Sequence, residues 1–155
     1  EGLARAGVRG CRAPRLVKGT RDVLVMEFID GAFSLKDDAA LKEHAVDRLL
    51  VCEAVGRSLA VQFFALGVWN ADLHPGNILL QPDASAPANA AAVLIDFGNT
   101  CRFTGGQLRA FATLVHAAAT NDASLIGEAF DLLGVEGASS GRLADLPRML
   151  KSMRL

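Results

Sequence analysis

Two short stretches of the sequence combine acidic and amide side chains in a pattern suited to phosphate chemistry. In the first, residues 70–77 read NADLHPGN, and Asp72 precedes Asn77 by five positions. In the second, Asp96 ends an apolar run and is followed by an aromatic residue and a glycine. Carboxylate and amide oxygens suit Mg²⁺, and such an ion can also hold phosphate oxygens. The pattern therefore predicts a site that binds a metal ion together with phosphate groups.

Each of these side chains has a task that its chemical type allows. Asp72 is the candidate catalytic residue, because a loop carboxylate can reach an attacking hydroxyl or water. Asn77 and Asp96 are the candidate metal ligands, since they offer a neutral and a charged oxygen. An aspartate after a strand is often only a turn former, and this simpler interpretation applies to either stretch alone. The two stretches together, in this order, favour the phosphate site.

A long helix is expected ahead of the first stretch. Ser34 and Asp37 form a capping-box-like start to a helical region, and Gly67 can end it in a left-handed conformation. Between them, apolar residues recur at alternating intervals of four and three, which predicts a single apolar face. The residues of this face are Ala45, Leu49, Cys52, Gly56, Leu59, Phe63 and Leu66.

Strands are expected on both sides of that helix. Residues 15–18 and 23–29 are β-prone runs that predict a hairpin, and the second run reads as a buried strand. After a loop that includes the first stretch, short strands are expected at 78–81 and 92–95. Residues 82–90, rich in Pro, Ala, Ser and Asp, predict an exposed hairpin loop between these two strands.

Further helices are expected in the last third of the chain. Thr104 and Gln107 form a capping-box pattern ahead of one helix, and Asp122 precedes another. Gly134 can end the latter. The remaining tail is expected to be helical, with Pro147 breaking it or starting its last piece.

Composition narrows the class of protein. The 155 residues, of which 51% are hydrophobic, are expected to form one globular domain. Sixteen Lys and Arg against 17 Asp and Glu give a formal charge of −1, and no basic block is present, so nucleic acid is not an expected partner. Cys11, Cys52 and Cys101 lie far apart and predict isolated reduced thiols.

Membrane insertion is not predicted from the apolar stretch at residues 49–69. This stretch contains Glu53, Arg57 and Gln62, which are unfavourable in hydrocarbon, so a buried helix of a globular domain is the better interpretation. The first ten residues also lack the apolar segment of a secretory signal.

The two stretches match the catalytic loop and the DFG element of kinases, and this match extends to the strand at 23–29. Kinase-like folds bind adenine beside such a strand, whose alternative interpretation here is an ordinary core strand and turn. Under the kinase interpretation, Met26 borders the pocket, the backbone of Glu27 and Ile29 pairs with the adenine edge, and Leu79 packs beneath the ring. For His74, a phosphate contact and a hydrogen bond that braces the loop are both open.

The sequence resembles the UbiB or aarF-domain (ADCK-type) atypical kinases over about residues 14–134. Its most specific part, GVWNADLHPGNIL at 67–79, is similar to the family's G-x-x-HADPHPGN-I-L loop. Asn70 stands in place of the usual His, Leu73 in place of Pro, and Asn99 where Met is frequent. None of these differences removes a candidate ligand.

The resemblance implies a fold, a cofactor and a cellular role. The implied fold is α+β and mainly helical: a kinase-like C-lobe at about 33–155, a hinge strand at 23–29, and a small β-hairpin carrying the catalytic and DFG loops. ATP and Mg²⁺ are the implied cofactors, with a lipid or quinone precursor as a further partner in ubiquinone biosynthesis. Membrane association is implied by resemblance alone, in a mitochondrion, a plastid or the bacterial cytoplasm.

No glycine-rich phosphate loop, strand lysine or partner glutamate can be placed ahead of Leu16, so we expect the N-lobe to be absent. Phosphoryl transfer depends on such positioning groups, and the chain alone is expected to be a poor catalyst. Two alternatives stay open: a small-molecule phosphotransferase of the aminoglycoside- or choline-kinase type, and a non-catalytic nucleotide- or lipid-binding module.

Overall fold

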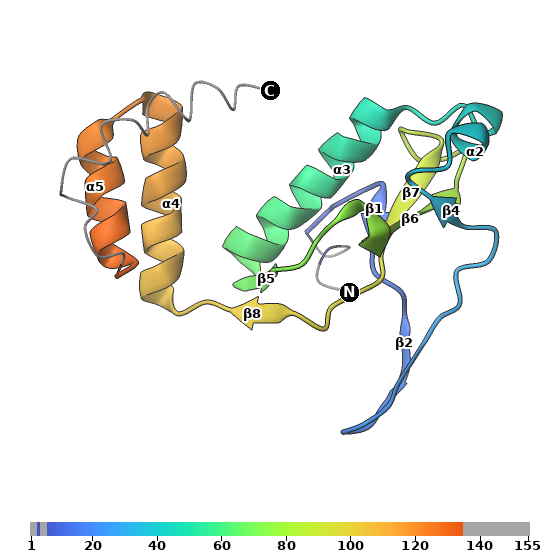
Figure 1. The fold of residues 1–155 in the computed structure, drawn as a ribbon, viewed down its shortest axis with the longest axis horizontal. Coiled ribbons are helices and arrows are strands. Elements are labelled where there is room, and N and C mark those ends of the chain that lie inside the picture. Colours follow the sequence, from blue (N-terminus) through green and yellow to red (C-terminus); the bar gives the residue numbers. More distant parts are fainter. Residues whose placement is uncertain (1–2, 4–5, 135–155) are drawn as a thin grey trace. The chain divides into compact units, whose positions relative to one another are not determined.

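The computed structural model describes Leu3 and residues 6–134, which contain both helices and strands (Figure 1). The chain divides into two compact units, the first ending at Cys101 and the second beginning at Arg102. The helical tail expected around Pro147 lies outside the described residues.

The first unit contains a four-stranded sheet. Its spatial order is β1 (Cys11–Arg12), β7 (Ala90–Leu94), β6 (Ile78–Pro82) and β4 (Phe33–Ser34). β1 runs parallel to β7, whereas the other neighbours are antiparallel. The strands predicted on either side of residues 82–90 are therefore confirmed, and they pair directly.

The core of this unit lies on one face of the sheet. Because side chains alternate along a strand, every second residue of β6 and β7 points to this face, where α3 lies against β1 and β7. The buried cluster consists of Cys11, Leu41, Val51, Ile78, Leu80, Ala88, Ala90, Ala92 and Leu94. Most residues of the loop between β6 and β7 are exposed, as predicted, whereas Ala86 and Ala88 are buried.

The prediction of a single long helix between Asp37 and Gly67 is wrong, because the helical region is interrupted. The structure has α2 (Asp38–Glu43), then α3 (Arg48–Ala60), followed by a π-helical turn, η1 (Val61–Ala65). Asp37 caps α2, and Asp47 caps α3 by accepting hydrogen bonds from two backbone amides. Between the two helices, Ala45 adopts a φ of 49°, which a helix cannot accommodate.

The break is held from outside the helices, by the loop between β6 and β7. Asn89 donates from Nδ2 to the carbonyl of Ala45 at 3.1 Å, and the amide of Asp47 donates to the carbonyl of Ala88 at 3.3 Å. These contacts come from residues more than forty positions away. The spacing of residues within the helical region therefore could not predict the break. Gly67, with a φ of 61°, ends the helical region as predicted.

The apolar face predicted for this helix is also wrong. Leu49 is 82% exposed and Cys52 is exposed, whereas Val51 is 2% exposed and Ser58 is buried. Apolar residues surround much of α3, so intervals of four and three could be traced along more than one side. The sheet selects the side that carries Val51.

The first hairpin is confirmed, but not its burial. β2 (Leu16–Gly19) pairs antiparallel with β3 (Leu24–Met26), and the hairpin projects from the four-stranded sheet (Figure 1). All seven strand residues are exposed, as is Phe28, so the prediction of a buried strand is wrong. Within the described residues, β2 and β3 form a two-stranded sheet of their own.

The second unit begins within β8 (Thr100–Arg102) and continues into α4 (Gly105–Thr120) and α5 (Ala123–Leu132), which lie against each other. The capping box of Thr104 and Gln107 is confirmed in full. Asp122 caps α5 as predicted, and Gly134 follows its end with a φ of 72°. The Ser124 hydroxyl, which donates to the Asp122 carboxylate, lowers the pKa of Asp122.

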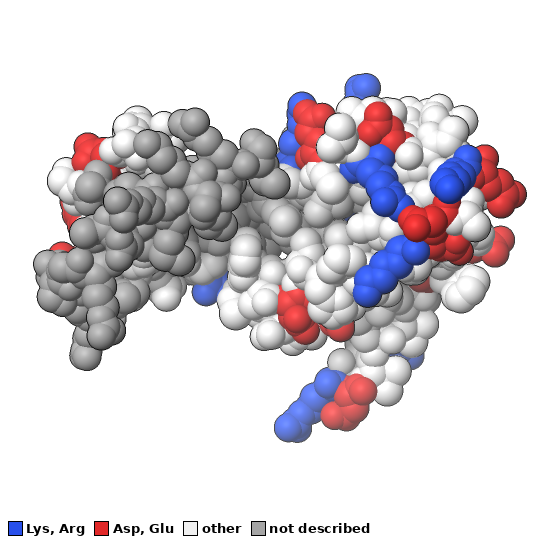
Figure 2. Space-filling model, turned by 45° about the horizontal axis from the view of Figure 1, so that its top comes forward, with Lys and Arg blue, Asp and Glu red and all other residues white. Residues whose placement is uncertain are grey.

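The surface carries charges of both signs. Figure 2 shows basic and acidic side chains interspersed over the first unit and at the tip of the hairpin, with no field of a single sign on the face shown. No helix in the described part of the chain has the length and apolar character needed to cross a bilayer.

Two substitutions on α3 test which side faces the core. Val51→Ala should lower the free energy of unfolding by about 2 kcal/mol, because it removes methyl groups from a buried site. Leu49→Ala should change it by no more than about 0.5 kcal/mol, since Leu49 is 82% exposed. Urea unfolding monitored by the fluorescence of Trp69, the chain's single tryptophan, measures both. A larger loss of stability for Leu49→Ala than for Val51→Ala would support the face predicted from the sequence.

Candidate functional site

The first candidate stretch connects β5 (Val68–Asn70) to β6. The segment predicted as a loop therefore contains a short strand, which pairs with β8, and a 3₁₀ turn, η2 (Pro75–Asn77). His74 caps this turn: its Nδ1 accepts from the amide of Gly76 at 3.0 Å. A β-carbon on Gly76 would lie 2.8 Å from the His74 ring, so glycine permits this contact. The loop-bracing hydrogen bond considered for His74 is thus present.

The second stretch follows directly from β7. Asp96 accepts from the amide of Gly98 at 2.8 Å through Oδ1, which closes a tight turn and fixes one carboxylate oxygen. The hydroxyl of Thr100 donates to the carbonyl of Phe97 at 2.7 Å and braces the far side of the same turn. Asp96 itself is exposed, so its carboxylate is accessible to a ligand.

Hydrogen bonds bring the two stretches together at one end of the β6–β7 pair. The amide of Ile95 donates to the carbonyl of Asn77 at 3.1 Å, and Asn77 donates from Nδ2 to the carbonyl of Asp72 at 3.1 Å. The amide of Ala71 donates to the carbonyl of Asn99 at 2.9 Å. Asp72, Asn77 and Asp96 therefore belong to one connected group of loops.

Asn70 is the central link between these loops. Its side chain is 2% exposed, donates from Nδ2 to the carbonyl of Asp96 at 2.5 Å, and accepts from the amide of Asp72 at 3.1 Å. One buried side-chain amide thus connects the backbone of the candidate catalytic aspartate, Asp72, to the backbone of the candidate metal ligand, Asp96. The sequence marked Asn70 only as a difference from the usual histidine, and its role was missed.

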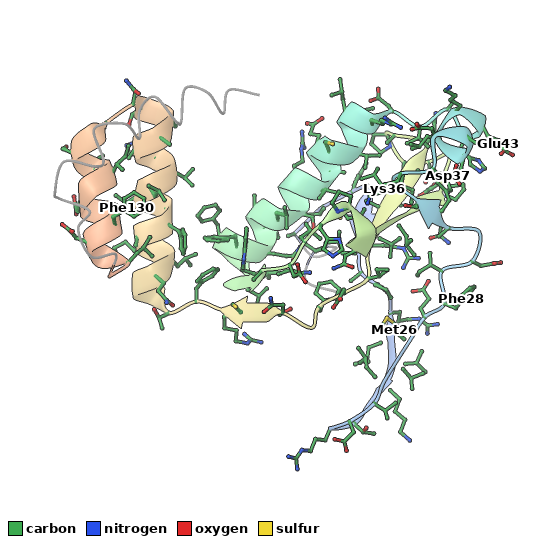
Figure 3. All side chains as sticks on the ribbon, viewed as in Figure 1. Met26, Phe28, Lys36, Asp37, Glu43 and Phe130 are labelled. Atoms are coloured by element: carbon green, nitrogen blue, oxygen red, sulfur yellow. The ribbon has the colours of Figure 1, made fainter. Side chains whose placement is uncertain are left out.

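A cleft of about 480 Å³ opens beside the second stretch. Its lining comprises Pro14, Leu16, Leu24, Met26, Ile95, Asp96, Phe97 and Gly98. One wall comes from the hairpin, where Figure 3 shows Met26, and the other from the turn after β7. The volume and the apolar lining with one carboxylate are typical of a small-molecule pocket.

The residues predicted to hold adenine are only partly gathered at this cleft. Met26 lines it, whereas Glu27, Ile29, Leu79 and His74 are not among the lining residues. Glu27 uses its amide to donate to the carbonyl of Arg15 at 2.9 Å, so its pairing with a ring edge is confined to its carbonyl. Leu79 pairs within the sheet with Ser34 and Val93, and Ile29 is buried.

The oxygen donors suit a hard divalent cation. Since Nδ2 of Asn77 is bound to a carbonyl, its Oδ1 is the atom offered to a ligand, and Asp96 adds a carboxylate. In the described part of the chain, no three His, Cys, Asp or Glu side chains gather into a metal site. Mg²⁺ tolerates so few protein ligands, because it retains waters and binds phosphate oxygens.

A cluster of polar side chains at the base of the hairpin was not predicted from the sequence. Arg12 donates to both carboxylate oxygens of Glu27 at 3.0 Å and to Oε1 of Gln81 at 2.8 Å. The hydrogen bond from Arg12 is the main reason that the pKa of Glu27 lies below its usual range. No local pattern connects these three positions, which lie on separate elements.

Comparison with known proteins is consistent with this geometry. Residues 6–130 match the model of the ABC1 atypical kinase-like domain. AarF domain-containing protein kinase 1 of Xenopus laevis is 33% identical over 91 residues, 56% of this chain and 17% of that protein. The probable protein kinase UbiB of Marinobacter nauticus is 37% identical over 78 residues, 50% of this chain and 14% of that protein.

A longer alignment is found with ABC1 family protein lscO of Purpureocillium lilacinum. It is 26% identical over 146 residues, 86% of this chain and 25% of that protein. The chain therefore spans about a quarter or less of the length of these curated relatives.

Removing the Asn70 amide tests its linking role. Asn70→Ala leaves the amide of Asp72 and the carbonyl of Asp96 without this partner, and should lower the free energy of unfolding by about 2 kcal/mol. Asn99→Ala is the matched control, because Asn99 is exposed and contributes through its backbone carbonyl. It should change stability by no more than about 0.5 kcal/mol. Equal effects in urea unfolding would contradict the role of Asn70.

Proposed function

Because the chain belongs to the family of ABC1 atypical kinase-like domains, we propose that it carries a Mg²⁺-dependent ATP site at the end of the β6–β7 pair. The observation that supports this most is the hydrogen-bonded group formed by Asp72, Asn77 and Asp96 through Asn70 and Ile95. These three side chains are those that the catalytic-loop and DFG motifs would require.

In this proposal each residue has one task. Asn77 and Asp96 hold Mg²⁺, which neutralises phosphate oxygens when it is bound. Asp72 orients an attacking hydroxyl or water and accepts its proton. His74 braces the loop and can also face a phosphate group.

The nucleoside half of ATP occupies the cleft beside Met26. Its apolar lining suits a purine ring, and Asp96 at the cleft edge places the phosphate end next to the metal ligands. The carbonyl of Glu27, the backbone of Ile29 and the side chain of Leu79 do not line the cleft, so they would contact adenine only where the ring extends beyond it. For Leu79 this requires an approach to the face of β6 opposite the core.

The acceptor is proposed to be a small molecule or lipid of isoprenoid-quinone metabolism, or water in an ATPase reaction. The family match over residues 6–130 weighs against the aminoglycoside- or choline-kinase alternative. A non-catalytic nucleotide-binding module would use the same site without turnover, so binding and turnover must be measured separately.

Metal binding gives the first test of this proposal. Asp96→Asn should weaken Mn²⁺ binding in the presence of ATP by more than about tenfold, because it removes the formal charge of a ligand. His74→Ala should weaken it no more than a few-fold, since at most one neutral hydrogen bond is lost. Electron paramagnetic resonance of free Mn²⁺ measures both affinities.

Asp83→Asn is the control, because it removes the same charge at the opposite end of the β6–β7 pair, where Asp83 caps a turn. A wild-type chain that binds neither Mn²⁺ nor ATP would contradict the proposed site. An Asp83→Asn effect as large as that of Asp96→Asn would show that the loss of net charge, and not the loss of a metal ligand, weakens Mn²⁺ binding.

The rate of ATP turnover distinguishes the proposed roles of Asp96 and His74. In a preparation that hydrolyses or transfers the γ-phosphate, Asp96→Asn should lower kcat by about 10²–10³, as expected for loss of a charge that stabilises the transition state. His74→Ala should lower kcat by no more than about tenfold, the equivalent of one neutral hydrogen bond. ATP turnover at saturating Mg²⁺ decides the order. A more damaged His74→Ala variant would show that the loop histidine organises the chemistry.

A further inference from the structure

The hairpin that forms one wall of the cleft is tied to the sheet by a cluster of three side chains: Arg12, Glu27 and Gln81. Arg12 lies on β1 and Gln81 on β6, so both belong to the four-stranded sheet. Glu27 directly follows β3 of the hairpin. The guanidinium of Arg12 binds both oxygens of Glu27 and the amide oxygen of Gln81, and thereby connects the two sheets.

Glu27 also joins the two strands of the hairpin at their base. Its Oε2 accepts from the amide of Arg15 at 2.9 Å, and its own amide donates to the carbonyl of Arg15 at 2.9 Å. Gln81 extends the contacts by donating to the carbonyl of Asp30 at 3.3 Å. A displacement of the Glu27 carboxylate therefore affects both the entry to the hairpin and the segment that leaves it.

The cleft depends on how the hairpin is held. Leu16, Leu24 and Met26 line it from the hairpin, yet these strands are exposed and form a sheet of their own. We propose that Arg12 and Glu27 are positioning residues, which hold the hairpin so that Met26 faces Asp96 across the cleft at the separation that a nucleoside requires. This inference rests on the proposed function.

The cluster differs from the other ion pairs of the described residues. Arg57–Glu53 and Arg48–Asp38 are more exposed pairs, with side-chain exposures of 73% and 52%, and of 58% and 73%. Arg12 and Glu27 are 34% and 27% exposed, and their contact is bidentate. Bidentate arginine–carboxylate pairs fix orientation as well as distance, whereas exposed single contacts contribute little.

Two conservative substitutions separate orientation from charge. Arg12→Lys retains the positive charge but cannot bind both oxygens of Glu27 and Gln81 together. Glu27→Gln retains an acceptor for the amide of Arg15 but loses the ionic contact. Each should weaken the binding of AMP by roughly tenfold, the equivalent of one charge-assisted hydrogen bond, because AMP reports on the nucleoside half of the site. Arg48→Lys, the same change in an exposed pair away from the cleft, should leave AMP affinity unchanged.

A second ligand distinguishes positioning from general destabilisation. Without nucleotide, the Mn²⁺ affinity of both variants should stay within about twofold of wild type, because Asn77 and Asp96 are held by the β6–β7 pair and Asn70. Equal losses of AMP and Mn²⁺ affinity, or folded variants with unchanged AMP affinity, would overturn the proposal.

The exchange rate of the Arg15 amide is a readout that does not need a nucleotide. This amide donates to Oε2 of Glu27, so Arg12→Lys should accelerate its exchange if Arg12 holds the carboxylate, while amides of β6 stay protected. Exchange unchanged by Arg12→Lys would overturn the proposal. A wild-type chain that binds no AMP would refute the proposed function instead. The exchange rate would then still test whether Arg12 holds the Glu27 carboxylate.

Discussion

The register of β6 against β7 places Ile78 opposite Leu94, so the residue before one strand and the residues after the other meet at the same end of the sheet. Asn77 immediately precedes β6, and Ile95 and Asp96 immediately follow β7. The backbone hydrogen bond from Ile95 to Asn77 extends the ladder by one step beyond the strands. A slip of one residue would turn Leu80 and Leu94, both fully buried, out of the core. The apolar burial that stabilises the β6–β7 pair therefore also fixes the position of the candidate ligands.

At this end of the β6–β7 pair, the side chain of Asn70 forms hydrogen bonds with the carbonyl of Asp96 and the amide of Asp72. A buried side-chain amide has both a donor and an acceptor, and here each meets a backbone group of a different loop. Asn70 is almost completely buried, and a polar group removed from water is unfavourable unless it is hydrogen-bonded. Burial therefore favours the one conformation in which both hydrogen bonds form. The asparagine that stands where the family's loop was expected to have histidine thus connects the two loops.

Much of the local structure could be predicted from the sequence, and the errors share a cause. The caps at Asp37, Thr104 and Asp122 follow from local hydrogen bonding, and so do both hairpins and the left-handed end at Gly67. The break at Ala45, by contrast, is held by Asn89, and the buried side of α3 is selected by the sheet. The proximity of the two loops was predictable, because the two motifs flank the hairpin formed by β6 and β7. The cluster of Arg12, Glu27 and Gln81 was not, because its members are distant in sequence and each is an ordinary surface residue by type.

The two walls of the cleft are held by different forces, which has a consequence for ligand binding. The wall that carries Asp96 continues β7, in which four of five residues are buried, whereas the hairpin wall depends on a contact between charged groups that are about a third exposed. Segments with few buried contacts open at lower free energy than core strands, so the hairpin is the more easily displaced wall. A ligand that touches both walls must restrict this motion, and part of its binding free energy is used to order the hairpin. A metal ion bound at Asp96 does not require that ordering. In the proposed site, the affinity for the nucleoside half would therefore depend on the base of the hairpin as well as on the candidate metal ligands.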